Sequence, residues 1–135
     1  MHPDFTKADR LSHEVIGAAI EVHRHKGPGL VESIYEKCLV RELELRGLRT
    51  TNQLLVPIEY KGLTFEEPLR LDVLVEGCVV VENKVVETIL PVHRAQLLSY
   101  MRLLNVPIGL LFNFNTSLLK DGGLVRLILD GADRP

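Results

Sequence analysis

The sequence lacks several features that identify common protein classes. Its two cysteines, Cys38 and Cys78, stand in no metal-binding spacing, which excludes a zinc site and a disulfide framework and predicts buried free thiols in a reducing cytosol. The net charge of −2 excludes a strongly basic nucleic-acid coat, although a focused basic patch is compatible with it. No apolar run approaches the roughly 20 residues of a membrane span, and no apolar signal region follows Met1. We therefore expect a cytoplasmic protein with no membrane contact.

Several familiar catalytic patterns are also missing. No Ser/His/Asp or Cys/His arrangement stands out, and the Gly-Pro-Gly at residues 27–29 lacks the Lys-Ser/Thr partner of a phosphate-binding loop. No repeat, linker or low-complexity tract is present. With 135 residues, 46% of them hydrophobic, the chain has enough material for one core. We predict a single domain over residues 1–135, with residues 1–10 as a loose N-terminal lead.

Apolar periodicity and turn signals divide the chain into three helices and five strands. The expected helices cover residues 12–25, 30–46 and 91–105. The expected strands cover residues 53–60, 63–69 continued by 71–75, 79–84, 107–114 and 124–129. The resulting order, ααβββαββ, predicts an α/β fold with a central mixed β-sheet flanked by helices.

Charged residues interrupt two adjacent β-branched runs, residues 70–75 and 79–84. The first run contains Asp72, and the second ends with Glu82 and Lys84. An acid in such a strand is costly unless something compensates its lost solvation. Two acids and a lysine on neighbouring strands supply the groups that a hard divalent cation and a phosphate need. The pattern therefore predicts a metal-dependent catalytic site.

The loop between these two runs decides whether the acids meet. A two-residue loop at 76–77 would place Asp72 and Glu82 on opposite faces, whereas a three-residue loop at 76–78 pairs them. We favour the three-residue loop because it separates apolar from charged residues better, with Asn83 on the apolar face beside Leu71, Val73, Val75, Val79 and Val81. An exposed hairpin with solvated charges is the alternative.

Two of the predicted helices carry polar residues on their apolar faces. Glu32 lies angularly between Leu39 and Leu43, so it points to the packed side, although an acid in a first turn also complements the helix dipole. In the third helix, His93, Gln96 and Tyr100 form a polar ladder within the apolar arc. Buried polar groups need partners, and the charged hairpin is the obvious place, while for His93 a core or capping role is the more ordinary interpretation. The apolar arcs expected on the two helices are Val31, Ile34, Tyr35, Cys38, Leu39 and Leu43, and Val92, Leu97, Tyr100, Leu103 and Leu104.

Several separated motifs resemble a known family. Residues 29–35 read Gly-Leu-Val-Glu-Ser-Ile-Tyr, which is similar to the signature of the GxxExxY family of small bacterial proteins, ending here at Tyr35. The resemblance covers roughly residues 11–129 and, because that family is placed in the PD-(D/E)XK nuclease superfamily, implies that the chain is a member of this superfamily. It includes Arg70-x-Asp72, Glu82-x-Lys84, Gln96-x3-Tyr100 and the segment 109–114 with its Asn113-Phe114.

The resemblance implies a restriction-endonuclease-like core and roles for particular residues. Asp72 and Glu82 would bind the metal, Lys84 would orient or activate the attacking water, and Glu32 would assist the metal site. Gln96 would support the site or contact the substrate, with His93, Tyr100 and Tyr35 in supporting places. Asn83 departs from the apolar residue usual between the Glu and the Lys, but its main-chain carbonyl would still serve as a metal ligand.

The resulting hypothesis is a Mg²⁺- or Mn²⁺-dependent nuclease that cleaves phosphodiester bonds in DNA, with RNA as the less favoured substrate. The alternative is a nucleic-acid-binding or assembly module that keeps the nuclease fold with little turnover. Mild acidity and small size favour this alternative, while the intact set of Asp72, Glu82 and Lys84 favours the enzyme. The expected partner is nucleic acid, and the sequence leaves a homodimer open.

Overall fold

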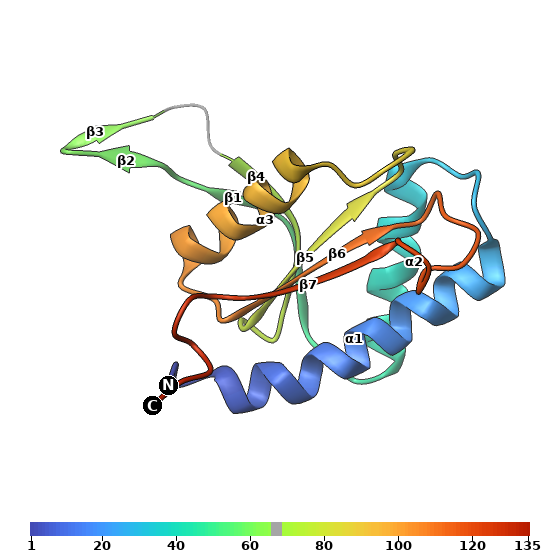
Figure 1. Cartoon of the computed structure of the whole chain (residues 1–135), viewed down its shortest axis with the longest axis horizontal. Coiled ribbons are helices and arrows are strands. Elements are labelled where there is room, and N and C mark those ends of the chain that lie inside the picture. The colour runs from blue at the N-terminus through green and yellow to red at the C-terminus, as the bar shows by residue number, and fades with distance from the viewer. Residues whose placement is uncertain (66–68) are drawn as a thin grey trace.

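The computed structural model describes residues 1–65 and 69–135, which form one mixed β-sheet between two helical layers (Figure 1). The strand order is β1-β4-β5-β6-β7, and only the β5–β6 pair is parallel. The predicted α/β fold with a central mixed sheet is thus confirmed. The strands of this sheet are β1 (Thr50–Val56), β4 (Leu69–Val75), β5 (Val79–Lys84), β6 (Ile108–Asn113) and β7 (Leu124–Ile128).

Helices cover both faces of the sheet. Helices α1 (Phe5–Lys26) and α2 (Glu32–Leu45) pack on one face, and α3 (Pro91–Leu104) packs on the other. The interior strand β6 is buried along its whole length, which explains why its sequence is a continuous apolar run. Because β5 and β6 are parallel, the chain needs a crossover between them, and α3 provides it.

The contact between α3 and β6 is very close. A Cβ added to Gly109 in β6 would lie 2.5 Å from the sulfur of Met101 and 3.0 Å from Leu97. Both of these α3 side chains are fully buried. Gly109 therefore sets how near α3 lies to the sheet.

The predicted loose lead over residues 1–10 is wrong for most of its length. Helix α1 begins at Phe5, seven residues before the predicted start, and Ala8 is fully buried. The apolar spacing of Phe5, Ala8 and Leu11 extends the buried helix face to the beginning of α1. Asp9 also forms an ion pair with Arg126 in β7, which ties this segment to the sheet.

The apolar arcs predicted for α2 and α3 are wrong at the helix ends. Val31 and Ile34 at the start of α2 are exposed, as are Val92 and Leu103 in the first and last turns of α3. Periodicity treats every turn as covered, but the sheet covers only the middle of each helix. Met101, which the prediction left out, is buried in their place.

Residues 57–65, which follow β1, form a two-stranded arm. The single strand predicted over residues 53–60 ends at Val56, before Pro57. The arm comprises β2 (Glu59–Tyr60) and β3 (Leu63–Thr64), and it projects away from the sheet (Figure 1). The strand predicted over 63–69 lies partly outside the described residues, at positions 66–68.

The other expectations concern cysteines and membranes. Both cysteines are free, and Cys78 is buried as predicted, but Cys38 is only half-buried. No helix within the described residues has the length and apolar character to cross a membrane.

Candidate metal-binding and catalytic site

The hairpin of β4 and β5 has the predicted three-residue loop. Val75 pairs with Val79, and Val73 pairs with Val81. The loop closes with a hydrogen bond of 3.0 Å from the Cys78 amide to the Val75 carbonyl. Gly77 adopts φ +69° as expected of a turn glycine. The register prediction is therefore confirmed for these valine pairs, whereas the regular ladder does not extend to Asp72 and Glu82.

Two carboxylates replace the regular strand ladder beyond this point. The Asp72 amide donates to Glu82 Oε1 at 3.1 Å, and the Asn83 amide donates to Asp72 Oδ2 at 2.8 Å. Each acid thus accepts a main-chain hydrogen bond from the opposite strand, and the two side chains lie together. In each acid, the described residues donate no hydrogen bond to the second oxygen, which leaves it available to a ligand.

The predicted face of Leu71 is wrong. Leu71 was expected beside Val73 and Val75, but it packs in the core under α3, whereas these valines pack under α1 and α2. The simple alternation of β4 therefore breaks at Asp72, where regular pairing with both neighbouring strands is also interrupted. A strict period of two could not predict this local irregularity.

The two acids share an environment that disfavours two negative charges. Glu82 is 4% exposed, and burial, with a further contribution from the charge of Asp72, raises its pKa to about 8. Burial also raises the pKa of Asp72, although its hydrogen bond from Asn83 opposes the shift. A divalent cation between the carboxylates would relieve their repulsion and suits their oxygen donors.

Few side-chain ligands are available to hold such a cation. No group of three or more Asp, Glu, His or Cys side chains in the described part of the chain is arranged to hold a metal ion. The residues present therefore fit an ion held by Asp72 and Glu82, with the main-chain carbonyl of Asn83 as a further candidate. Water would complete the coordination, as it commonly does for Mg²⁺.

Lys84 ends β5 and connects the hairpin to α3. Its Nζ donates to Gln96 Oε1 at 3.3 Å. Nearby, the Tyr100 hydroxyl donates to the Arg70 carbonyl at 2.9 Å, which joins α3 to the start of β4. Burial raises the pKa of Tyr100, and the charges of Glu82 and Asp72 raise it further. Gln96 and Tyr100 thus both contact the hairpin that carries the acids, but only Tyr100 is buried. The prediction that Gln96 lies in the apolar arc is wrong, because it is exposed.

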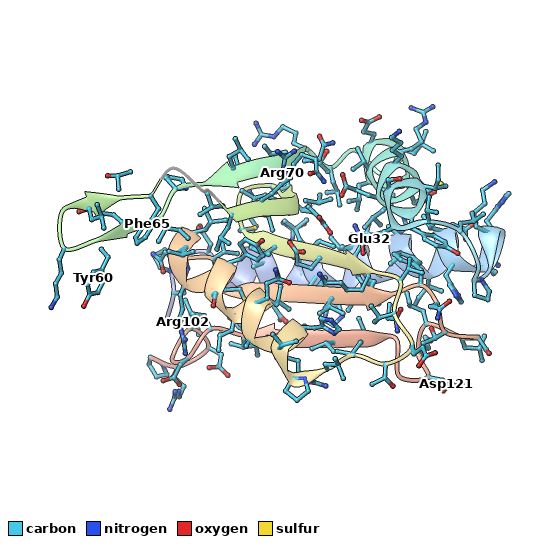
Figure 2. The ribbon with its side chains drawn as sticks, turned by 90° about the horizontal axis from the view of Figure 1, so that it is seen from above. Glu32, Tyr60, Phe65, Arg70, Arg102 and Asp121 are labelled. Carbon is cyan, nitrogen blue, oxygen red and sulfur yellow. The ribbon has the colours of Figure 1, made fainter. Side chains whose placement is uncertain are left out.

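Glu32 is the first residue of α2 and is exposed, so the prediction that it points to the packed side is wrong. Figure 2 shows it at the junction of α2 and the sheet. Partial burial raises its pKa, the charge of Asp72 raises it further, and Lys84 lowers it. Glu32 therefore lies within electrostatic range of the acid pair, and it also complements the N-terminal dipole of α2.

Two residues expected to support the site have other contacts. His93 Nδ1 accepts a hydrogen bond of 2.9 Å from the Leu90 amide, so His93 caps the N-terminus of α3. The Tyr35 hydroxyl donates to the Gly27 carbonyl, and its ring stacks on Phe114 with centroids 4.5 Å apart. Tyr35 thus supports the loop before α2, and neither residue is hydrogen-bonded to the acids.

Asn83 occupies the predicted buried face. Its side chain is fully buried, and neither its amide nitrogen nor its oxygen has a hydrogen-bond partner among the described residues. A buried polar group in this condition is costly. In contrast, buried Asn113 is well satisfied, because it bonds to both the amide and the carbonyl of Val86. Asn113 thereby holds the chain just beyond Lys84.

The sequence analysis missed Glu36 and Gln53. Glu36 is 9% exposed and accepts hydrogen bonds from Gln53 Nε2 at 2.7 and 2.9 Å. Burial raises the pKa of Glu36, Gln53 lowers it, and Asp72 raises it. The spacing of Glu36, one turn after Glu32, was a signal that could have found it. Gln53 gave none, because its contact joins distant parts of the chain.

Comparison with family models gives a match over residues 9–127 to the PD-(D/E)XK nuclease superfamily. This range includes the acid pair, Lys84, Glu32 and Glu36 of α2, and the contacts from α3. Searches among curated proteins and among solved structures found no significant match.

Proposed function

The chain belongs to the PD-(D/E)XK nuclease superfamily, and on this basis we propose that it is a Mg²⁺- or Mn²⁺-dependent nuclease that hydrolyses phosphodiester bonds in DNA. The observation that carries the proposal is the pair formed by half-buried Asp72 and buried Glu82, whose carboxylates lie together and each keep one oxygen open. The five-stranded mixed sheet, with helices on both faces, is the framework expected for this superfamily.

Each side chain has a proposed role that follows from its position. Asp72 and Glu82 would hold the cation, with the main-chain carbonyl of Asn83 as a further ligand. When bound, the cation would supply Lewis-acid polarisation of the scissile phosphate. Lys84 orients the attacking water and stabilises the negative charge that develops on the phosphate, and Gln96 holds the Lys84 ammonium in place. Glu32 adds negative charge at the rim of the site.

We further infer that the chain is a GxxExxY protein. Both signature side chains have a structural role that supports this assignment. Glu32 lies within electrostatic range of Asp72, and the Tyr35 hydroxyl bridges the Gly27 carbonyl and the Leu30 amide in the preceding loop. The signature would thus join one residue of the site to one that shapes the approach to α2.

A second candidate function is an assembly module with the nuclease fold. The arm favours it, because Tyr60, Leu63 and Phe65 are 61%, 59% and 40% exposed, and clustered exposed apolar residues are typical of protein–protein contacts. Figure 2 shows Tyr60 and Phe65 on the arm, away from Glu32. A homodimer formed through the arms is one version of this candidate and does not exclude the nuclease.

One assay tests the proposed activity. The purified protein is incubated with single-stranded, duplex and branched DNA and with RNA, in Mg²⁺, Mn²⁺ or EDTA. We expect cleavage of DNA that requires the metal and is lost in Asp72→Asn. Asp121→Asn is the matched control, because Asp121 is an exposed acid in a turn far from Glu32 (Figure 2). Metal-independent cleavage, or cleavage that survives Asp72→Asn, would contradict the nuclease proposal.

A further inference from the structure

Gln53 has an unusual backbone conformation at a significant position. It lies inside β1, yet its φ is +54°, in the left-handed region that residues other than glycine adopt at a cost. The neighbouring residues of β1 keep one register with β4, and by that register Gln53 lies opposite Asp72. Gln53 is therefore not the extra residue of a β-bulge, and the register of β1 with β4 is the same on both sides of it. The irregular backbone lies at the position opposite Asp72.

The left-handed conformation changes where the Gln53 amide points. Directly opposite residues of an antiparallel pair place their side chains on the same face, with Cβ atoms about 4.5–5.5 Å apart. In an extended conformation, residue 53 would thus pair with Asp72 and place its side chain beside the Asp72 carboxylate, whichever residue stands there. Instead, the amide donates to both oxygens of Glu36, and Asp72 accepts a hydrogen bond only from the Asn83 amide within the described residues.

We propose that Gln53 is a positioning residue whose left-handed backbone keeps β1 from closing over Asp72 and so leaves one Asp72 oxygen open to the cation. The two hydrogen bonds to Glu36 offset the backbone strain. This inference rests on the proposed function of the acid pair, and it assigns a role to a residue that touches neither the cation nor the substrate. Strain of this kind persists only where the surrounding structure holds it.

Two substitutions separate the backbone from the side chain. Gln53→Ala and Gln53→Gly both remove the amide, but only glycine adopts positive φ without strain. In Gln53→Ala, the strand loses the bonds to Glu36 and relaxes to the extended conformation, which pairs β1 with β4 at Asp72. In Gln53→Gly, residue 53 can remain in the left-handed conformation without strain. Thr51→Val is the matched control, because Thr51 is exposed in the same strand.

The measurement is Mn²⁺ binding to the metal-free protein by titration calorimetry, without nucleic acid. Loss of a residue that orients a metal ligand typically weakens affinity about 10–100-fold, and we expect a loss in this range for Gln53→Ala. Gln53→Gly should stay within about threefold of wild type, and Thr51→Val should not change. Equal affinities in Gln53→Ala and wild type would overturn the inference, as would equal losses in the alanine and glycine variants.

A cleavage assay adds an independent readout. In Gln53→Ala, the rate should fall at limiting Mn²⁺ and recover at saturating Mn²⁺, because the defect lies in cation affinity and not in the chemical step. A rate that stays low at saturation would contradict the proposed role. If wild type itself binds no Mn²⁺, the proposed function fails. If wild type binds and the Gln53 variants bind equally well, only the inference about Gln53 fails.

Discussion

Glu82→Gln should stabilise the metal-free protein at alkaline pH. Burial and the charge of Asp72 raise the pKa of Glu82 from 4.5 to about 8 in the folded protein. A raised pKa means that the folded state binds the proton more tightly than the unfolded state does. This tighter proton binding contributes to the free energy of unfolding. The contribution is complete below pH 4.5 and is lost as the pH rises through 8.

The expected size of this effect follows from the two pKa values. Each tenfold difference in proton affinity corresponds to about 1.4 kcal/mol. The difference between a pKa of 4.5 and one of about 8 therefore lowers the free energy of unfolding by about 4–5 kcal/mol above pH 8. Glutamine is uncharged, and its side-chain oxygen can still accept the hydrogen bond from the Asp72 amide. Glu82→Gln should therefore remove most of the loss in stability between pH 5.5 and 9.

Urea denaturation in EDTA measures the effect directly. The free energy of unfolding of wild type should fall from pH 5.5 to pH 9, whereas that of Glu82→Gln should change much less. Asp121→Asn, which removes an exposed acid, should behave like wild type. If Glu82→Gln and wild type lose stability in parallel, the buried charge is not the cause, and the electrostatic account of the acid pair is wrong.

Three further predictions concern neighbouring residues. Mn²⁺ should raise the melting temperature of wild type, because a ligand of the native state stabilises it, and Asp72→Asn should remove most of this gain in a thermal melt; equal gains would show that the acids bind no metal. Lys84→Ala should abolish cleavage in a gel assay while the Mn²⁺ response remains, since contacts to transition-state charge contribute about 10²–10³ in rate. Gln96→Ala should have a milder effect on the rate. A fully active Lys84→Ala would show that the activity belongs to another site. Asn83→Val should stabilise the protein by about 1–3 kcal/mol in urea, because it removes an unpaired buried amide; no gain would mean that the amide has a partner.

The sequence predicted what depends on local pattern. Alternating residues in two adjacent runs and one turn glycine, Gly77, were enough to place Asp72 beside Glu82. The spacing of Gln96 and Tyr100 in α3 likewise predicted their contacts with the hairpin, although Gln96 is exposed and His93 caps the helix. These predictions succeed because a hairpin register and a helix face are set by neighbours along the chain.

The missed features depend on irregular backbone or on long-range contacts. The positive φ of Gln53 breaks the rule that strand residues are extended, and its bond to Glu36 joins segments that only the folded sheet brings together. The break in alternation at Asp72 moved Leu71 to the other core. Periodicity also overestimated the burial of residues at the ends of α2 and α3, because it carries no information about where the sheet ends.

The close contact at Gly109 limits how this sequence can vary. An alanine there would press on Met101 and Leu97, which are buried and have little room to turn away, so α3 would have to move outward. Gln96 lies on the same helix and would move away from Lys84 with it. A single methyl group in β6 would thus disturb the site without touching either acid. The mutational tolerance of this chain is restricted beneath the site as well as within it.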